Sequence, residues 1–171
     1  MAPATEKRQA RTRKKELRAG DVMTRDVVKV PADLTVEELA GIFMENEISG
    51  APVVDEDGAL VGVVSVFDIA RQSSEEAGVV TEQGNPEFYV RGWEEKYTPE
   101  EFRKLRIQEG NLTVRELMTP AIFTVEEDDP VSEVARTLVD GHIHRVLVTR
   151  GHEVVGIITS LDLLRAYLDR R

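Results

Sequence analysis

The chain contains no cysteine, few aromatic residues and no long apolar run. Without cysteine it forms neither disulfides nor thiolate metal sites, and a cysteine nucleophile is excluded. No apolar segment reaches the roughly 20 residues that a membrane-spanning helix needs. The first residues also lack the apolar stretch of a secretory signal. We therefore expect a cytoplasmic protein without a membrane partner.

The chain also lacks the residue combinations of common enzymes. It has no glycine-rich phosphate loop of the NTPase kind, and no serine has an obvious base partner. His142 and His144 would share one face of an extended segment, but His152 lies across a turn and no third zinc ligand is evident. We expect no catalytic site, no metal site and no covalent cofactor.

The net charge of −10 is unevenly distributed. Residues 1–20 carry seven Lys/Arg and two Glu, so this segment has a charge of +5 and the remainder a charge of −15. An acidic body does not resemble a nucleic-acid groove, and we expect no nucleic-acid partner. The basic residues 1–16 are predicted to be a solvated tail; a nucleic-acid-binding arm at 7–18 is the alternative.

An internal repeat organises the rest of the chain. Val-Met-Thr at 22–24 matches Leu-Met-Thr at 117–119, and 36–40 matches 131–135 at the same offset of 95. After a turn the offset becomes 94, and 62–68 (Gly-Val-Val-Ser-Val-Phe-Asp) matches 156–162 (Gly-Ile-Ile-Thr-Ser-Leu-Asp). The lost residue falls in the turn, where deletions cost least.

Each copy predicts the element order β-α-β-β-α. In the first copy Thr35 and Glu38 form a capping box before an amphipathic helix; in the second, Asp129 is placed to cap and Pro130 to begin the helix. The expected strands are 27–30, 51–54, 60–64, 122–125, 146–149 and 154–158, and the closing helices are 66–71 and 160–168.

The pattern predicts an α/β (α+β) fold of two units packed with pseudo-two-fold symmetry. One copy of about 55 residues is marginal as an independent core, so the copies should share a face, with two equivalent clefts along the seam. We expect domains at 17–71 and 112–171. The acidic insertion at 72–111 holds five of the nine aromatic residues. It should form one helix at about 99–109, with its rings packed on the module rather than on a partner.

In both copies a strand ends at Gly-x-x-Ser/Thr-x-x-Asp and a helix begins. Taken alone, this motif is typical of a capping box. A helix N-terminus also attracts phosphate, a hydroxyl can donate to it, and an acid can accept from ribose hydroxyls. The glycine could let a ligand backbone approach closely. Its presence in both copies favours the ligand-binding interpretation.

The ordered set of motifs resembles a tandem pair of CBS domains, the Bateman module. Asp21-Val-Met-Thr24, Glu116-Leu-Met-Thr119, Ile48-Ser-Gly-Ala-Pro-Val-Val54, Ile143-His-Arg-Val-Leu-Val148 and the two Gly-x-x-Ser/Thr-x-x-Asp turns carry the resemblance. It covers about 17–71 and 112–168. The long insertion is similar, more loosely, to that of single-pair CBS proteins of plant organelles.

The resemblance implies the site residues. Asp68 and Asp162 correspond to ribose-binding acids, and Ser65 and Thr159 to hydroxyls that touch ribose or phosphate. His144-Arg145 corresponds to a pair facing the phosphates, but the first copy has Ser49-Gly50 in its place. The adenine pocket would be lined by Thr24, Thr119, Val27, Val28, Ile122 and Phe123.

The implied function is a non-catalytic sensor that binds AMP, ADP or ATP, forms a homodimer of modules and regulates a partner protein. Three alternatives stay open at this point. They are a ligand-free protein-interaction scaffold, S-adenosylmethionine as the ligand, and nucleic-acid binding through 7–18. The sequence identifies neither the partner nor the phosphate count.

Overall fold

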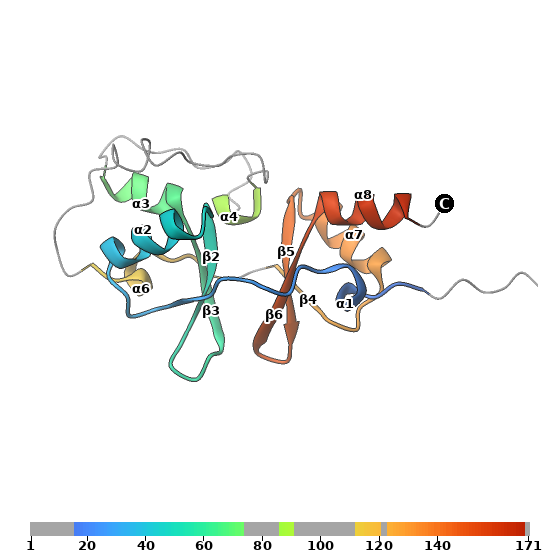
Figure 1. Ribbon diagram of the computed structural model, residues 1–171, viewed down its shortest axis with the longest axis horizontal. Helices are drawn as coiled ribbons and strands as arrows, with labels where there is room; N and C mark the ends of the chain where they lie inside the picture. The colour runs from blue at the N-terminus through green and yellow to red at the C-terminus, as the bar shows by residue number, and fades with distance from the viewer. Residues whose placement is uncertain (1–15, 74–85, 91–111, 121–122, 170–171) are drawn as a thin grey trace, which may run out of the picture.

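A computed structural model describes residues 16–73, 86–90, 112–120 and 123–169 (Figure 1). Each repeat forms a three-stranded sheet with two longer helices. The first contains β1 (Val30–Pro31), α2 (Val36–Glu45), β2 (Gly50–Val54), β3 (Leu60–Ser65) and α3 (Val66–Ser73). The second contains β4 (Thr124–Glu126), α7 (Val131–Asp140), β5 (Arg145–Arg150), β6 (Glu153–Thr159) and α8 (Ser160–Leu168). Within the described residues there are also three single-turn helices, α1 (Ala19–Val22), α4 (Glu87–Val90) and α6 (Val114–Leu117). The predicted mixed α/β class and the repeated element order are confirmed.

The two sheets have the same topology. In each, the first strand runs parallel to the second, and the second pairs with the third as an antiparallel hairpin. Gly50 lies opposite Ser65, and Arg145 lies opposite Thr159, so the registers also correspond. The hairpin turns contain Gly58 and Gly151 at positive φ, a conformation that glycine adopts without steric cost.

The first strands are shorter than predicted. Strand β1 begins only at Val30, and the predicted stretch from Val27 to Lys29 lies outside the ladder. Val27 and Val28 are half-buried, and both contribute to a pocket described below. These two valines therefore pack their apolar side chains at the pocket instead of forming hydrogen bonds in the sheet.

The helix starts follow the sequence in one repeat and depart from it in the other. At α2 the Glu38 carboxylate accepts from the Thr35 N–H at 2.9 Å and the Glu38 N–H donates to Thr35 Oγ1 at 3.2 Å, which confirms the capping box. At α7 the prediction was wrong, because Pro130 is itself the N-cap. Asp129 does not cap; its carboxylate accepts from the Glu126 N–H at 2.9 Å and closes the preceding turn.

The repeats exchange their leading helical turns (Figure 1). Helix α1 belongs by sequence to the first repeat, yet the Ala19 N–H donates to the Asp129 carbonyl of the second at 2.8 Å. Helix α6 mirrors it, because the Val114 N–H donates to the Leu34 carbonyl at 2.8 Å. Ala19 and Val114 are fully buried, each in the core of the other repeat. The exchange therefore ties the halves into one module.

The glycines of the repeated motif serve this contact between repeats. A Cβ at Gly62 would lie 2.7 Å from both Met118 Sδ and the Thr119 carbonyl oxygen. A Cβ at Gly156 would lie 2.8 Å from Met23 Cγ and 3.0 Å from the Thr24 carbonyl oxygen. The expectation that these glycines admit a ligand backbone was wrong, since the backbone that approaches is the other repeat's Met-Thr segment.

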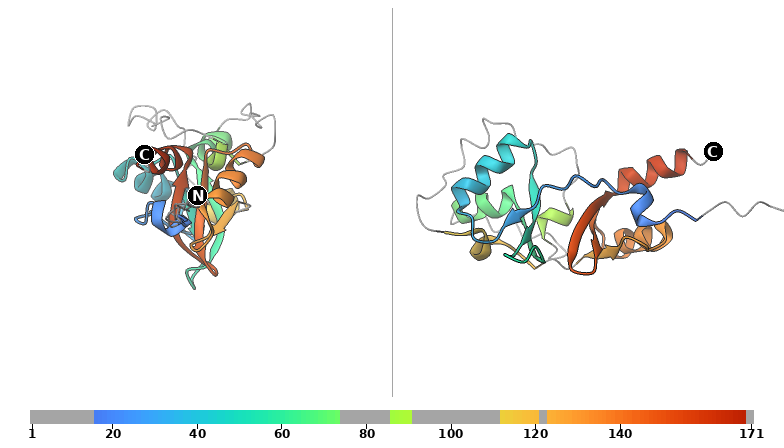
Figure 2. Two further views of the ribbon diagram at one scale, coloured as in Figure 1. Left: turned by 90° about the vertical axis from the view of Figure 1, so that its right-hand side faces the viewer. Right: turned by 60° about the horizontal axis from the view of Figure 1, so that its bottom comes forward.

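Two hydrophobic cores lie on either side of the seam where the hairpins face each other (Figures 1 and 2). Helix α4 of the insertion contacts β3 and β5 at this seam. Its Phe88 and Tyr89 are buried, as expected for rings packed on the module. The predicted helix at 99–109, Trp93, Tyr97 and Phe102 lie outside the described residues.

Candidate ligand site between the repeats

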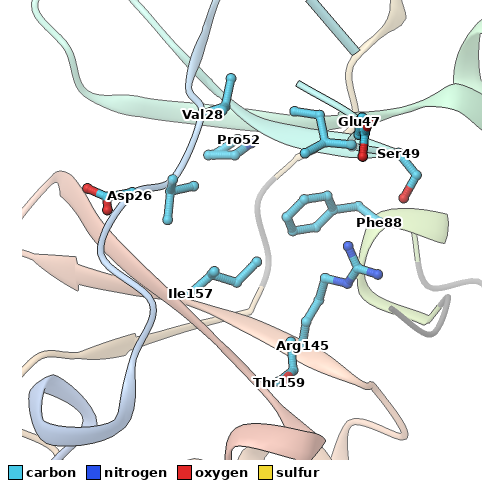
Figure 3. A pocket seen from close by; sticks show the side chains of 12 residues that line it. Asp26, Val28, Glu47, Ser49, Pro52, Phe88, Arg145, Ile157 and Thr159 are labelled. Atoms are coloured by element: carbon cyan, nitrogen blue, oxygen red, sulfur yellow. The ribbon is translucent and has the colours of Figure 1, made fainter. Parts of the chain in front are cut away.

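A pocket of about 260 Å³ opens between the two repeats (Figure 3). Its volume is slightly below the range of about 300–1,000 Å³ typical of small-molecule sites, which suits a ligand with one end in solvent. The lining comes from both repeats and from α4: Asp26, Val27, Val28, Glu47, Ile48, Ser49, Gly50, Pro52, Phe88, Arg145, Ile157 and Thr159.

One part of the pocket is an apolar slot. Val28 and Pro52 of the first repeat face Ile157 of the second across it (Figure 3). The segment before Val28 is fixed by a two-way backbone pairing, in which the Thr24 N–H donates to the Ile157 carbonyl at 2.9 Å and the Ile157 N–H donates back at 3.0 Å. Thr24 therefore does not line the pocket but sets where its wall lies.

The polar part begins where β6 meets α8. Thr159 lines the pocket and is the N-cap of this nine-residue helix. The Asp162 carboxylate accepts through Oδ2 from the Thr159 N–H at 2.8 Å and from Oγ1 at 2.6 Å. Its Oδ1 lies 3.8 Å from Arg165 Nη1, and the side chain is 16 % exposed. The motif is thus a capping box, and Oδ1 keeps acceptor capacity because an ionised carboxylate has about four lone-pair sites.

Arg145 supplies the cation of the pocket. It reaches the cavity from the start of β5, and its guanidinium carbon lies 5.5 Å from the centre of the Phe88 ring (Figure 3). A cation at this distance over an aromatic ring is held by a cation–π interaction. Arg145 and Thr159 are opposite each other in the β5–β6 register, so the cation and the hydroxyl come from the same repeat.

The equivalent motif of the first repeat is buried more deeply. Asp68 is only 4 % exposed, and Ser65 is 2 % exposed. Oδ2 of Asp68 accepts from the Ser65 N–H and Oγ, each at 2.7 Å, while Oδ1 pairs with Arg71. Burial raises the pKa of Asp68 above its ordinary value, against the lowering effects of Ser65 and Arg71. Both oxygens of this acid are therefore engaged inside the fold.

The structure brings together only some of the predicted site residues. Val27, Val28, Arg145 and Thr159 line the pocket, and Asp162 adjoins Thr159 without lining it. Ser65, Asp68, Thr119 and His144 do not line it; Thr119 instead pairs with Val63 as Thr24 pairs with Ile157. Ile122 lies outside the described residues, and Phe123 contacts the insertion.

Sequence reasoning missed several lining residues. Ser49, Pro52 and Ile157 come from strands or strand ends whose positions follow from the repeat, but nothing local indicates that they face a cavity. Phe88 was recognised only as a packing residue. The concentration of rings in an otherwise acidic insertion was the signal that could have placed it at the seam.

A second cavity, of about 540 Å³, lies at the hairpin turns and is lined by Lys29, Val54, Asp57, Gly58, Ala59, Arg150, His152 and Glu153. Its mixed charges and the Lys29–Glu153 ion pair at 3.7 Å suit a solvated surface. Among the described residues no three His, Asp or Glu side chains gather as metal ligands. In the same part of the chain no helix has the length and apolar character to cross a membrane.

Two sheets with exchanged leading turns, and a pocket at the seam, define a tandem pair of CBS domains. The chain belongs to the CBS-domain family, whose sequence model matches residues 19–75 and 114–169. A relative is the CBS domain-containing protein CBSX1, chloroplastic, of Arabidopsis thaliana, which is 34 % identical over 152 residues. That match covers 87 % of this chain, which spans 63 % of the length of the relative.

Solved structures of CBS pairs share the fold. CBSX2 in complex with AMP is 25 % identical, with a TM-score of 0.62 over 90 % of this chain and 98 % of that one. The CBS domain pair of protein MJ0100, in complex with 5′-methylthioadenosine and S-adenosyl-L-methionine, is also 25 % identical. Its TM-score is 0.61, and the match covers 92 % of this chain and all of the other.

Proposed function

We propose that this CBS pair is a regulatory module that binds AMP, ADP or ATP in the open pocket and transmits its presence to a partner protein. The observation that carries the proposal is the convergence of an apolar slot, a helix N-cap hydroxyl and an arginine in one cavity between the repeats. The AMP complex of CBSX2 supports the same class of ligand.

Each part of a nucleotide has a complementary part of the pocket. The base would lie in the slot between Val28, Pro52 and Ile157, where burial of a flat apolar ring is favourable. The ribose would lie beside Thr159, with its hydroxyls donating to Asp162 Oδ1. The phosphates would then face the N-terminus of α8, whose partial positive charge favours anions, and the Arg145 guanidinium.

Binding at a seam provides a signal because the ligand contacts both repeats. A nucleotide stabilises whichever relative arrangement of the repeats lets Val28 and Thr159 contact it together. It alters the affinity for a partner only as far as the two arrangements differ in nucleotide affinity. The non-catalytic role stays a prediction.

S-adenosylmethionine is the second candidate ligand, because the MJ0100 pair was solved with it. It shares the adenosine but carries no phosphate. Arg145 could pair with the carboxylate of that ligand, but a phosphate carries more negative charge and is the stronger partner for a guanidinium. We also propose a homodimer, for which the exposed apolar side chains of α7 and α8, Val139, Leu164, Tyr167 and Leu168, provide a surface. The cytoplasmic location stays a prediction.

Isothermal titration of the full chain with AMP, ATP and S-adenosylmethionine tests the proposal. Asp162→Ala should abolish or strongly weaken adenylate binding. Glu116→Ala is the matched control, since Glu116 closes a capping box with Thr113 of the same geometry away from the pocket. Equal losses in both variants, or no heat with any adenylate, would contradict the proposal and support a scaffold.

A further inference from the structure

The repeat predicts a second cleft that corresponds to the open pocket. With the offsets of 95 before the turn and 94 after it, Val28 corresponds to Phe123 and Ser49 to His144. Likewise Ile157 corresponds to Val63, and Thr159 to Ser65. The hydrogen bonds of α1 and α6, and of Thr24 and Thr119, obey the same correspondence, so the symmetry is structural as well as sequential.

Tyr89 of the insertion lies at this second cleft. Its side chain is fully buried, and its ring meets the Phe123 ring edge-to-face at 5.2 Å between centres. The Phe123 N–H points to Tyr89 Oη at 3.5 Å, and the His144 N–H donates to the Tyr89 carbonyl at 2.8 Å. These contacts are made with the counterparts of Val28 and Ser49, two residues that line the open pocket.

The surrounding apolar residues agree with this placement. Tyr89 belongs to one core cluster with Val63, Ile143 and Leu147, the counterparts of Ile157, Ile48 and Pro52 in the open pocket. A flat ring thus occupies, in the second cleft, the kind of slot that is open in the first. A nucleobase could enter it only after Tyr89 leaves.

The acid of the second cleft is also engaged. Asp68 corresponds to Asp162 and has the equivalent partners, Ser65 and Arg71, but its side chain is 4 % exposed against 16 % for Asp162. Two observations therefore distinguish the clefts: the ring in the slot and the deeper burial of the carboxylate.

We propose that the second cleft is filled by the chain's own Tyr89, so that each chain takes one adenine nucleotide and not two. The number of nucleotides per chain rests on the proposed function, which assigns the ligand of the open pocket. The occupation of the second cleft by Tyr89 does not depend on that function. Tyr89 acts there as an internal ligand, and its turn, α4, also carries Phe88 into the wall of the open pocket.

The test is the stoichiometry of AMP binding to the full chain by isothermal titration. Wild type should bind one AMP per chain, and Tyr89→Ala should gain a second, weaker site. Met44→Ala, which removes an exposed apolar side chain of α2, is the control and should keep one site. Two sites in wild type, or no gain of a site in folded Tyr89→Ala, would overturn the inference.

Failure of the proposed function gives a different pattern. If wild type binds no AMP, the function of the open pocket is refuted, while a single site gained by Tyr89→Ala still supports self-occupation. Should Tyr89→Ala fail to fold, hydrogen exchange of the wild-type His144 amide decides. Strong protection both without and with saturating AMP supports the inference, and loss of protection in either state overturns it.

Discussion

Arg145→Ala removes the pocket's cation, and its effect should depend on the phosphate of the ligand. Hydrogen bonds to charged groups contribute about 1.5–3 kcal/mol, which corresponds to roughly a 10- to 150-fold change in dissociation constant. Because the pocket opens to solvent, we expect the lower end, about a tenfold weaker affinity for AMP. Adenosine has no phosphate, so its affinity should change by less than about twofold.

The assay is isothermal titration of wild type and variant with AMP and with adenosine at one ionic strength. Arg136→Ala is the matched control, because Arg136 is an exposed arginine on α7 whose ion pair with Glu133 is remote from the cavity. Equal losses of AMP and adenosine affinity in Arg145→Ala would refute the reasoning. They would mean that Arg145 shapes the pocket through Phe88 instead of binding phosphate.

Three further predictions concern the scaffold. Gly62→Ala should lower the free energy of unfolding, measured by urea denaturation, by about 1–3 kcal/mol, because the added methyl group would meet Met118 and the Thr119 carbonyl. The control Gly41→Ala, on α2, adds its methyl group in open space and should be neutral or stabilising. Because the pKa of Asp68 is raised in the folded state, the wild-type free energy of unfolding should fall relative to that of Asp68→Asn as the pH rises from below 3.8 through the raised value. A constant difference in the free energy of unfolding across that interval would contradict the burial of the charge. Leu168→Glu, on the exposed apolar face of α8, should convert the proposed dimer to a monomer in light scattering, and an unchanged dimer mass would reject that face as the interface.

The sequence predicted the elements whose signals are local. Helix α8 was expected at 160–168 and spans Ser160–Leu168, because its hydroxyl N-cap and apolar pattern lie within a few residues. The α2 capping box was likewise evident from Thr35 and Glu38. By contrast, the start of β1 depends on its pairing with a parallel strand about 20 residues further along the chain. Val27 and Val28, predicted to be in this strand, line the pocket instead.

The candidate site was predicted only partly. The sequence repeat is symmetric, whereas the folded molecule is not. The duplication predicts equivalent roles for Asp68 and Asp162, yet Asp68 is buried and paired with the exposed Arg71, whereas Asp162 is beside the open pocket. The clefts also differ at Tyr89 and Phe88, which come from a segment without a counterpart in the repeat. Their position depends on long-range packing at the seam, which no spacing rule gives.

The role of the glycines was missed for a similar reason. Gly62 and Gly156 stand next to a strand-to-helix turn, where close approach of a ligand is one physical explanation. The structure shows that the approaching group is a Met-Thr segment exchanged from the other repeat. Nothing in either half alone reveals that exchange, because the two partners are separated by more than 50 residues.

The most direct measurement of the central claim is an AMP titration of the isotope-labelled chain followed by amide chemical shifts. We predict that the amides of Val28, Ser49 and Thr159 shift together and saturate at one equivalent, while those of Ser65, Phe123 and His144 stay in place. Shifts that centre on Ser65 and His144, or a spectrum that AMP leaves unchanged, would contradict the assignment of the open pocket as the nucleotide site.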